Sequence, residues 1–157
     1  MNKDVSRKDA KRHKNARDIL CFFATLREIK KSMNENQLSR EIVDSAFKIH
    51  TRWGPGLLES VCESVLAHEL AKRGLQVSTQ QGVPVVWEAV RLDIGFRADL
   101  VVNQKVIVEI KSGESIAPVH AKQVRTYLKI MDLRLGLLIN FNVDLIKNGI
   151  TRVVNNL

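Results

Sequence analysis

The chain has 157 residues, with 25 Lys and Arg against 17 Asp and Glu, and a formal net charge of +8. This length suits one domain of ordinary size with some additional chain. The composition excludes a collagen-like chain, a disulfide framework and a membrane helix, because no apolar run approaches the roughly 20 residues that a membrane span needs. Cys21 and Cys62 form no CxxC unit, so we expect two reduced thiols in a cytoplasmic protein and no cysteine-based zinc site.

The positive charge is concentrated near the N-terminus. Residues 1–32 carry ten basic and four acidic side chains, or +6, whereas the remaining 125 residues carry 15 and 13, or +2. We expect residues 33–157 to form the domain and residues 1–32 to be a basic extension. This extension is either disordered or the product of a misassigned start, in which case translation begins at Met33. A basic arm can bind phosphates or be a solvated tail, and both interpretations stay open. Its apolar stretch Ile19–Leu26 has charged flanks and no cleavage site, which argues against a signal peptide.

Two helices are predicted at the start of the domain. Apolar residues recur at helical spacing from Leu38 until the sequence GPG at 54–56 interrupts the pattern. A second helix is expected over Leu57–Arg73 and should stop at Gly74, since glycine adopts the left-handed conformation of a helix end without strain.

The pattern then changes from helices to strands. The remaining predicted elements are strands at Gln76–Gln80 and Val83–Trp87, a strand centred on Arg97–Val102, a strand at Lys105–Lys111, a helix at 118–131, and strands at Gly136–Phe141 and Ile150–Val154. The helix at 118–131 should return the next strand parallel to a neighbour. We therefore expect an α/β fold with a mixed central sheet flanked by helices.

The chemistry is concentrated in the hairpin of the two central strands. Its even-numbered residues are apolar and should share the core face: Leu100, Val102, Val106, Val108 and Ile110. The opposite face carries Asp99, Glu109 and Lys111. Pairing Leu100 with Val108 puts Asp99 directly across from Glu109 and needs a three-residue turn at 103–105.

Two neighbouring carboxylates repel each other unless a cation or a proton lies between them. Mg²⁺ suits this pair because it uses few protein carboxylates and keeps waters and phosphate oxygens. Lys111 is close enough to Glu109 to contact a metal-bound water or the developing charge on a phosphate. The alternative is a structural salt bridge on a solvated face. The tripeptide alone does not decide, since acidic-x-Lys also occurs at 9–11 and 28–30.

Together these residues resemble the PD-(D/E)XK nuclease superfamily, in which an acidic residue on one strand is followed by (D/E)-x-K on the next, with a Glu-bearing helix before and a helix after. The corresponding residues are Asp99, Glu109-Ile110-Lys111, Glu59 and the helix at 118–131. The GFRAD sequence at 95–99 and the spacing of Gln123 and Tyr127 are similar to the RecB-type branch. The motifs GLLE, PVVW, RADL, VIVEIKS and GLLINFN are similar to small bacterial proteins of the GxxExxY family.

The resemblance implies a restriction-endonuclease-like core and hydrolysis of phosphodiester bonds in DNA, rather than RNA, with Mg²⁺ or else Mn²⁺. The residues it implies are Asp99, Glu109 and Glu59 for the metal, Lys111, Gln123 and Glu59 for catalysis, and Arg97, Lys122 and Tyr127 for nucleic acid. No membrane partner is expected, and a homodimer stays open.

Some features have simpler explanations. A Glu in the first turn of a helix, such as Glu59, is favoured by the helix dipole anyway, and polar pairs at the spacing of Gln123 and Tyr127 are common on amphipathic helices. Cys62 stands where the GxxExxY family has tyrosine, which favours a packing role, and Ala98 stands where the superfamily has proline. The alternative function is a catalytically silent nuclease fold that binds nucleic acid or a protein partner.

Overall fold

The computed structural model describes residues 28–30 and 32–157, apart from the side chain of Ile94. All elements below belong to the compact unit Met33–Leu157. The apolar stretch Ile19–Leu26 lies outside the described residues. No helix in the described part of the chain is long and apolar enough to cross a membrane.

The predicted helices are confirmed with small shifts at their ends. α2 spans Glu35–Trp53 and begins with a capping box, in which the side chains of Asn34 and Gln37 each accept the other's backbone N–H at 2.9 Å. It ends at Gly54, whose φ of 67° is the left-handed conformation. α3 spans Glu59–Lys72, two residues shorter at its start than predicted, because Leu58 is still extended. α4 spans Pro118–Ile130 with proline in its first turn.

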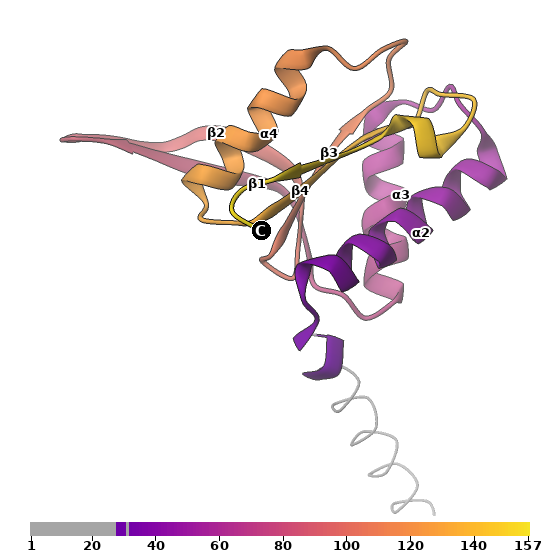
Figure 1. The fold of residues 1–157 in the computed structure, drawn as a ribbon, viewed down its shortest axis with the longest axis horizontal. Helices are drawn as coiled ribbons and strands as arrows, with labels where there is room; N and C mark the ends of the chain where they lie inside the picture. Colours follow the sequence, from indigo (N-terminus) through magenta and orange to yellow (C-terminus); the bar gives the residue numbers. More distant parts are fainter. Residues whose placement is uncertain (1–27, 31) are drawn as a thin grey trace, which may run out of the picture. The chain divides into compact units, whose positions relative to one another are not determined.

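The described strands form one mixed sheet. They are β1 Val77–Trp87, β2 Val90–Val102, β3 Val106–Lys111, β4 Leu135–Asn140 and β5 Ile150–Val154. Their order in the sheet is the order in the chain, and only β3 and β4 are parallel. As predicted, the helix α4 makes the crossover between these two strands (Figure 1).

The two strands predicted at 76–80 and 83–87 are a single strand, β1. The pairing of β1 with β2 shifts between Val83 and Val85, on either side of Pro84. Proline has no N–H to donate, so it disturbs the ladder without ending an edge strand. β2 also starts earlier than predicted, at Val90.

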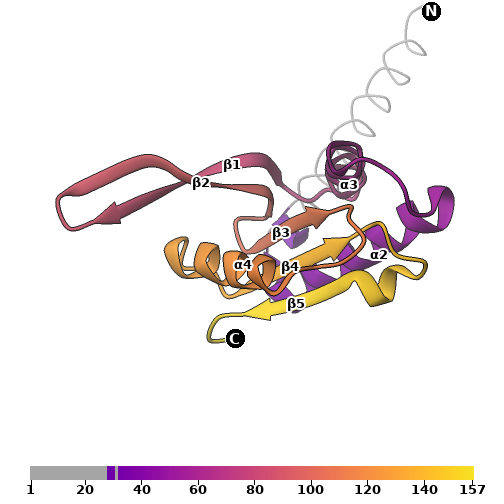
Figure 2. The same cartoon turned by 90° about the horizontal axis from the view of Figure 1, so that it is seen from above.

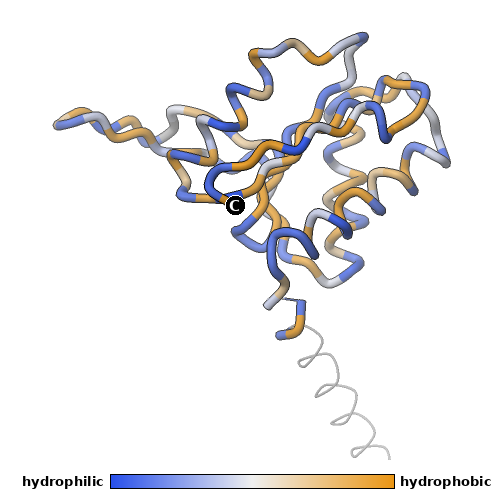
Figure 3. The backbone as a smooth tube through the Cα atoms, viewed as in Figure 1, coloured by the Kyte–Doolittle hydropathy of each residue, from blue (hydrophilic) through white to orange (hydrophobic). Residues whose placement is uncertain are grey.

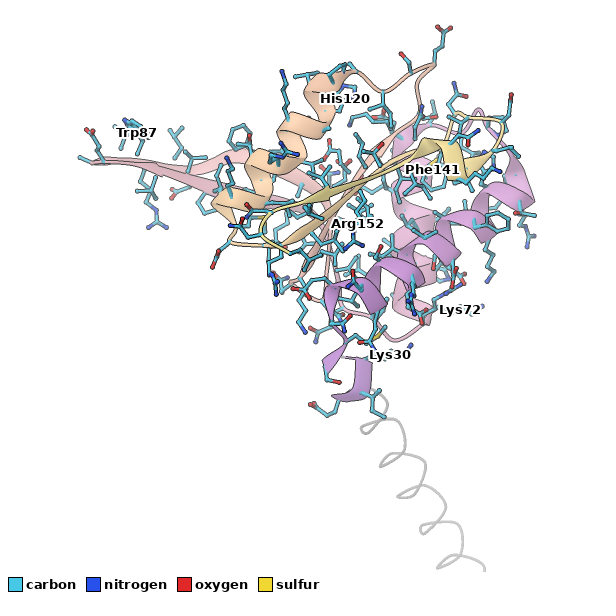
Figure 4. The ribbon with its side chains drawn as sticks, in the orientation of Figure 1. Lys30, Lys72, Trp87, His120, Phe141 and Arg152 are labelled. Carbon is cyan, nitrogen blue, oxygen red and sulfur yellow. The ribbon has the colours of Figure 1, made fainter. Side chains whose placement is uncertain are left out.

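Residues 83–96 form a hairpin arm that extends beyond the other strands of the sheet (Figures 1 and 2). Val85 pairs with Leu92 and Trp87 with Val90, so these four apolar side chains share one face. Trp87 is 73% exposed at the outer end of the arm (Figure 4). Hydrophobic residues therefore follow the arm as well as the central strands (Figure 3).

Helices cover both faces of the central strands. The even-numbered residues between 100 and 110 lie in the core with α2 and α3, on the shared face that the alternation predicts, whereas Ala98, Val101 and Ile107 pack against α4. Figure 1 shows α2 and α3 together on one side of the strands and α4 on the other. The alternative of a solvated odd-numbered face therefore does not apply at Val101 and Ile107, because the crossover helix lies over them.

The 3₁₀ helix η1, Ile146–Gly149, passes close to the end of β4, and this closeness gives a test of the packing. A Cβ on Gly149 would lie 2.2 Å from the backbone oxygen of Asn140. Since a backbone atom cannot simply move aside, Gly149→Ala should lower the free energy of unfolding by about 1–3 kcal/mol. Gly113→Ala is the matched control, because its nearest heavy atom is 4.0 Å away. Urea unfolding measures both, and a wild-type midpoint for Gly149→Ala would contradict this packing.

Candidate active site

The predicted register of β2 and β3 is confirmed. Leu100 pairs with Val108 and Val102 with Val106, across a three-residue turn at 103–105. The backbone pairing ends at Leu100 and Val108, however, one residue short of the expected pair of Asp99 with Glu109. Asp99 Oδ2 instead accepts the backbone N–H of Ile110 at 2.8 Å. Asp99 therefore meets β3 through its side chain at the point where the strand ladder stops.

Glu109 and Lys111 form a half-enclosed ion pair on β3. Lys111 Nζ donates to Glu109 Oε1 at 2.9 Å and to the carbonyl of Ile110 at 3.0 Å. Glu109 is 4% exposed, and its Oε2 is buried without a hydrogen-bond partner. A buried carboxylate oxygen without a partner is energetically costly.

Burial and charge act differently on the two members of this pair. Burial raises the pKa of Glu109 above its usual range, and the hydrogen bond from Lys111 only partly opposes it. Burial acts to lower the pKa of Lys111, but the hydrogen bond and charge of Glu109, with the charges of Asp99 and Glu59, raise it overall. Lys111 is thus held as a cation, whereas Glu109 is poorly compensated.

Glu59 is brought to the same place by the start of α3. Its Oε1 accepts the backbone N–H of Ser112 at 3.0 Å, and the Ser112 hydroxyl donates to the carbonyl of Leu57. These two bonds join the beginning of α3 to the residue that follows Lys111. The charge of Glu59 contributes to the pKa values of both Glu109 and Lys111.

Gln123 and Tyr127 contact each other on α4, where Gln123 Nε2 donates to the Tyr127 hydroxyl at 2.5 Å. Burial raises the pKa of Tyr127, and the charges of Glu109 and Asp99 act in the same direction. Its ring is 2% exposed and lies 5.2 Å from that of Phe96. The contact of Tyr127 with nucleic acid stays a prediction, and in this structure α4 packs the ring into the core.

Arg97 and Lys122 are both exposed, Arg97 two residues before Asp99 on β2 and Lys122 beside Gln123 on α4. They come from two elements that also carry predicted site residues. A cavity of about 430 Å³ holds two of the predicted site residues, Glu59 and Asp99. It is lined by Leu58, Glu59, Ser60, Glu63, Gln80, Asp99 and Ile110. A second cavity, of about 450 Å³, lies beside the end of α2 and contains none of the predicted site residues.

The donor set suits a hard divalent cation in its chemistry. Asp99, Glu109 and Glu59 offer carboxylate oxygens, and the buried Oε2 of Glu109 lacks a partner. In the described part of the chain, no three acidic, histidine or cysteine side chains stand close enough together to hold an ion as they are. These side chains are therefore of the kind that binds a divalent cation, but in this structure they are not gathered into a complete binding site.

A sequence model of the PD-(D/E)XK nuclease superfamily matches residues 36–153. The chain belongs to this superfamily. Neither the curated proteins nor the solved structures gave a match. The mixed sheet and its flanking helices agree with the restriction-endonuclease-like fold of PD-(D/E)XK proteins, and membership supports a nuclease-type function. The narrower resemblance to the GxxExxY family stays a prediction.

Cys62, the departure from the GxxExxY pattern, has the packing role expected for it. It is fully buried in the core with Leu66 and Leu70 of α3. Burial raises the pKa of its thiol to about 11, so it stays protonated near neutral pH.

Four residues near the PD-(D/E)XK motif were missed in the sequence: Glu63, Gln80, Ser112 and Asn140. Gln80 Nε2 donates to Glu63 Oε2 at 2.6 Å and lies 3.4 Å from Asp99 Oδ1. Asn140 Nδ2 donates to the carbonyl of Gly113 at 2.8 Å, just beyond the motif. Two signals were present: Glu63 follows Glu59 by one helical turn, and Asn140 is a polar residue in an apolar strand.

Glu109→Gln tests whether the buried carboxylate is present for a metal or for the fold. The amide keeps the shape but removes a charge that burial disfavours, so in EDTA at pH 7 the variant should have a higher Tm than the wild type. Because the pKa of Glu109 is raised, the folded wild type loses stability relative to the variant as pH rises above the usual Glu value. The increase in Tm on adding Mg²⁺ should disappear.

Thermal melts in EDTA and in Mg²⁺ at two pH values measure these differences. A variant that melts below the wild type in EDTA would show that Glu109 is chiefly the structural partner of Lys111.

Proposed function

We propose that this PD-(D/E)XK protein is a metal-dependent nuclease that hydrolyses phosphodiester bonds in DNA. The observation that carries the proposal is the buried Glu109, with one oxygen bonded to Lys111 and the other without a partner. A bound cation would remove that cost, and Asp99 and Glu59 bring further carboxylates to the same end of β3. DNA is proposed over RNA on the resemblance to RecB-type motifs.

Asp99, Glu109 and Glu59 are the proposed ligands of Mg²⁺, with Mn²⁺ as an alternative ion. When bound, such an ion lowers the pKa of a coordinated water and polarises the phosphate. Two of these carboxylates are held by backbone N–H groups at the end of β3 and just after it, since Asp99 accepts from Ile110 N–H and Glu59 from Ser112 N–H.

Lys111 acts as a donor in the proposed mechanism, because its raised pKa keeps it protonated. Its ammonium group orients the attacking water and stabilises the negative charge on the phosphate oxygens while the P–O bond breaks. Gln123 positions the water from the α4 side. Arg97 and Lys122, both exposed, contact the phosphates on either side of the scissile bond.

The second candidate function is a nuclease fold that binds nucleic acid or a protein without turnover. It is favoured by the state of the site in this structure. Lys111 already donates to Glu109 Oε1, and within the described residues no three potential metal ligands lie close together.

A cleavage assay separates the two functions. Plasmid, linear and single-stranded DNA, and RNA, are incubated with the full chain in Mg²⁺, Mn²⁺ or EDTA. We expect DNA cleavage only with a metal, and a loss of about 10²–10³-fold in rate for Lys111→Ala, the range seen when one charge-stabilising donor is removed. Lys129→Ala, an exposed lysine of the same charge on α4, is the control. Cleavage that survives Lys111→Ala, or none in either metal, would favour the non-enzymatic module.

The basic extension gives a separate prediction. Residues 1–32 carry +6 of the net +8, so their deletion should weaken non-specific DNA binding and flatten its dependence on salt, while cleavage by residues 33–157 persists. Fluorescence anisotropy at several salt concentrations measures the slope, and circular dichroism checks that the shortened chain folds. An unchanged slope would assign the phosphate contacts to the domain, and loss of folding would make Ile19–Leu26 part of its core.

A further inference from the structure

Gln80 has an unusual backbone conformation next to the candidate site. It lies in β1 with a φ of 49°, in the left-handed region that residues other than glycine rarely adopt. The residues on both sides keep regular pairing with β2, Thr79 with Leu100 and Gln81 with Ala98. Gln80 is therefore the residue of β1 that stands opposite Asp99. A strained residue held between regular pairs is often part of a functional site.

In this conformation, the side chain of Gln80 links two carboxylates. Its Nε2 donates to Glu63 Oε2 at 2.6 Å and lies 3.4 Å from Asp99 Oδ1. An amide nitrogen has two N–H donors, so it can serve both acceptors. Since both partners are carboxylates, the opposite orientation of the amide would place its oxygen against negative charge. The chemistry of the neighbours therefore determines which end of the amide faces them.

With Gln80, both carboxylate oxygens of Asp99 have a hydrogen-bond donor nearby. Asp99 Oδ2 is bonded to Ile110 N–H at 2.8 Å, and Oδ1 faces the amide of Gln80. Both oxygens are thus directed by donors from different strands, and each retains a lone pair. The same three side chains, Glu63, Gln80 and Asp99, line the cavity of about 430 Å³ together with Glu59.

We propose that Gln80 is a positioning residue for Asp99, and that Glu63 fixes the amide of Gln80 in the orientation this requires. The inference rests on the proposed function, because Asp99 is there a metal ligand. Partners of metal ligands set the orientation of those ligands, and their loss typically weakens metal binding or activity about 10–100-fold. Gln80 itself touches neither substrate nor metal in this role.

The test compares two glutamines of similar backbone conformation. Gln80→Met keeps the length of the side chain and removes its donors. Gln104→Met is the matched control, since Gln104 also has a positive φ, 55°, is exposed, and donates to the Ser78 hydroxyl rather than to a carboxylate. Isothermal titration calorimetry of the full chain with Mn²⁺ should show about tenfold weaker binding for Gln80→Met and wild-type binding for Gln104→Met. In the cleavage assay, kcat should fall for Gln80→Met with KM for DNA unchanged.

A metal-free measurement tests the link between Gln80 and Asp99 directly. In EDTA, Gln80→Met should lower the urea midpoint more in the wild-type background than in the Asp99→Ala background, because the pair is coupled. Equal shifts in both backgrounds, or equal Mn²⁺ affinity of Gln80→Met and wild type, would overturn the inference. Wild-type protein that binds Mn²⁺ without cleaving nucleic acid would overturn the proposed function alone, and wild-type protein that binds no Mn²⁺ would overturn both.

Discussion

The last part of β3 and the loop that follows it extend past the end of the pairing with β2, and the amide groups there need other hydrogen-bond partners. Side chains supply them. Asp99 accepts from Ile110 N–H, Glu59 from Ser112 N–H, and Asn140 from Gly113 N–H at 3.3 Å. Two of these three acceptors, Asp99 and Glu59, are among the three carboxylates proposed as metal ligands. The same bonds that satisfy the backbone of β3 therefore hold the carboxylates at its end, and the site is a consequence of where the ladder stops.

Electrostatics then divides the site into two parts. Asp99 and Glu59 have backbone donors, whereas Glu109 has Lys111 on one oxygen and nothing on the other. The negative charges of all three carboxylates raise the pKa of Lys111, so it remains a cation. One lysine cannot compensate three carboxylates, so the arrangement is incomplete in charge as well as in hydrogen bonds. This imbalance is the physical reason that a divalent cation suits the end of β3.

Much of this arrangement follows from local patterns in the sequence. The alternation in 100–110 predicts the register and the buried even-numbered face, and the proline at 118 predicts the start of α4. The patterns fail where one element depends on another. The backbone conformation of Gln80 is set by its neighbours in space, and the strand break expected between 80 and 83 does not exist because β2 pairs along the whole of β1.

Burial of Tyr127 could not be inferred for a similar reason. Its spacing from Gln123 is the same whether α4 turns that face to solvent or to the sheet. The contact with Phe96 decides between these, and Phe96 belongs to a part of β2 that the sequence patterns did not identify as a strand. Ser112 lies in the loop after β3, which carries no periodic signal, and the partner of Asn140, Gly113, lies in the same loop.

The hairpin arm at 83–96 affects how the protein opens. A two-stranded ribbon with an uncovered apolar face has little to stabilise it beyond its cross-strand pairs, so its amides should exchange with solvent at a lower free-energy cost than those of the helix-covered strands. The fully buried Val83 and Ala98 mark where such local opening stops. Asp99 comes directly after that boundary, so the arm can fray and re-form many times while the carboxylate at its base stays in place.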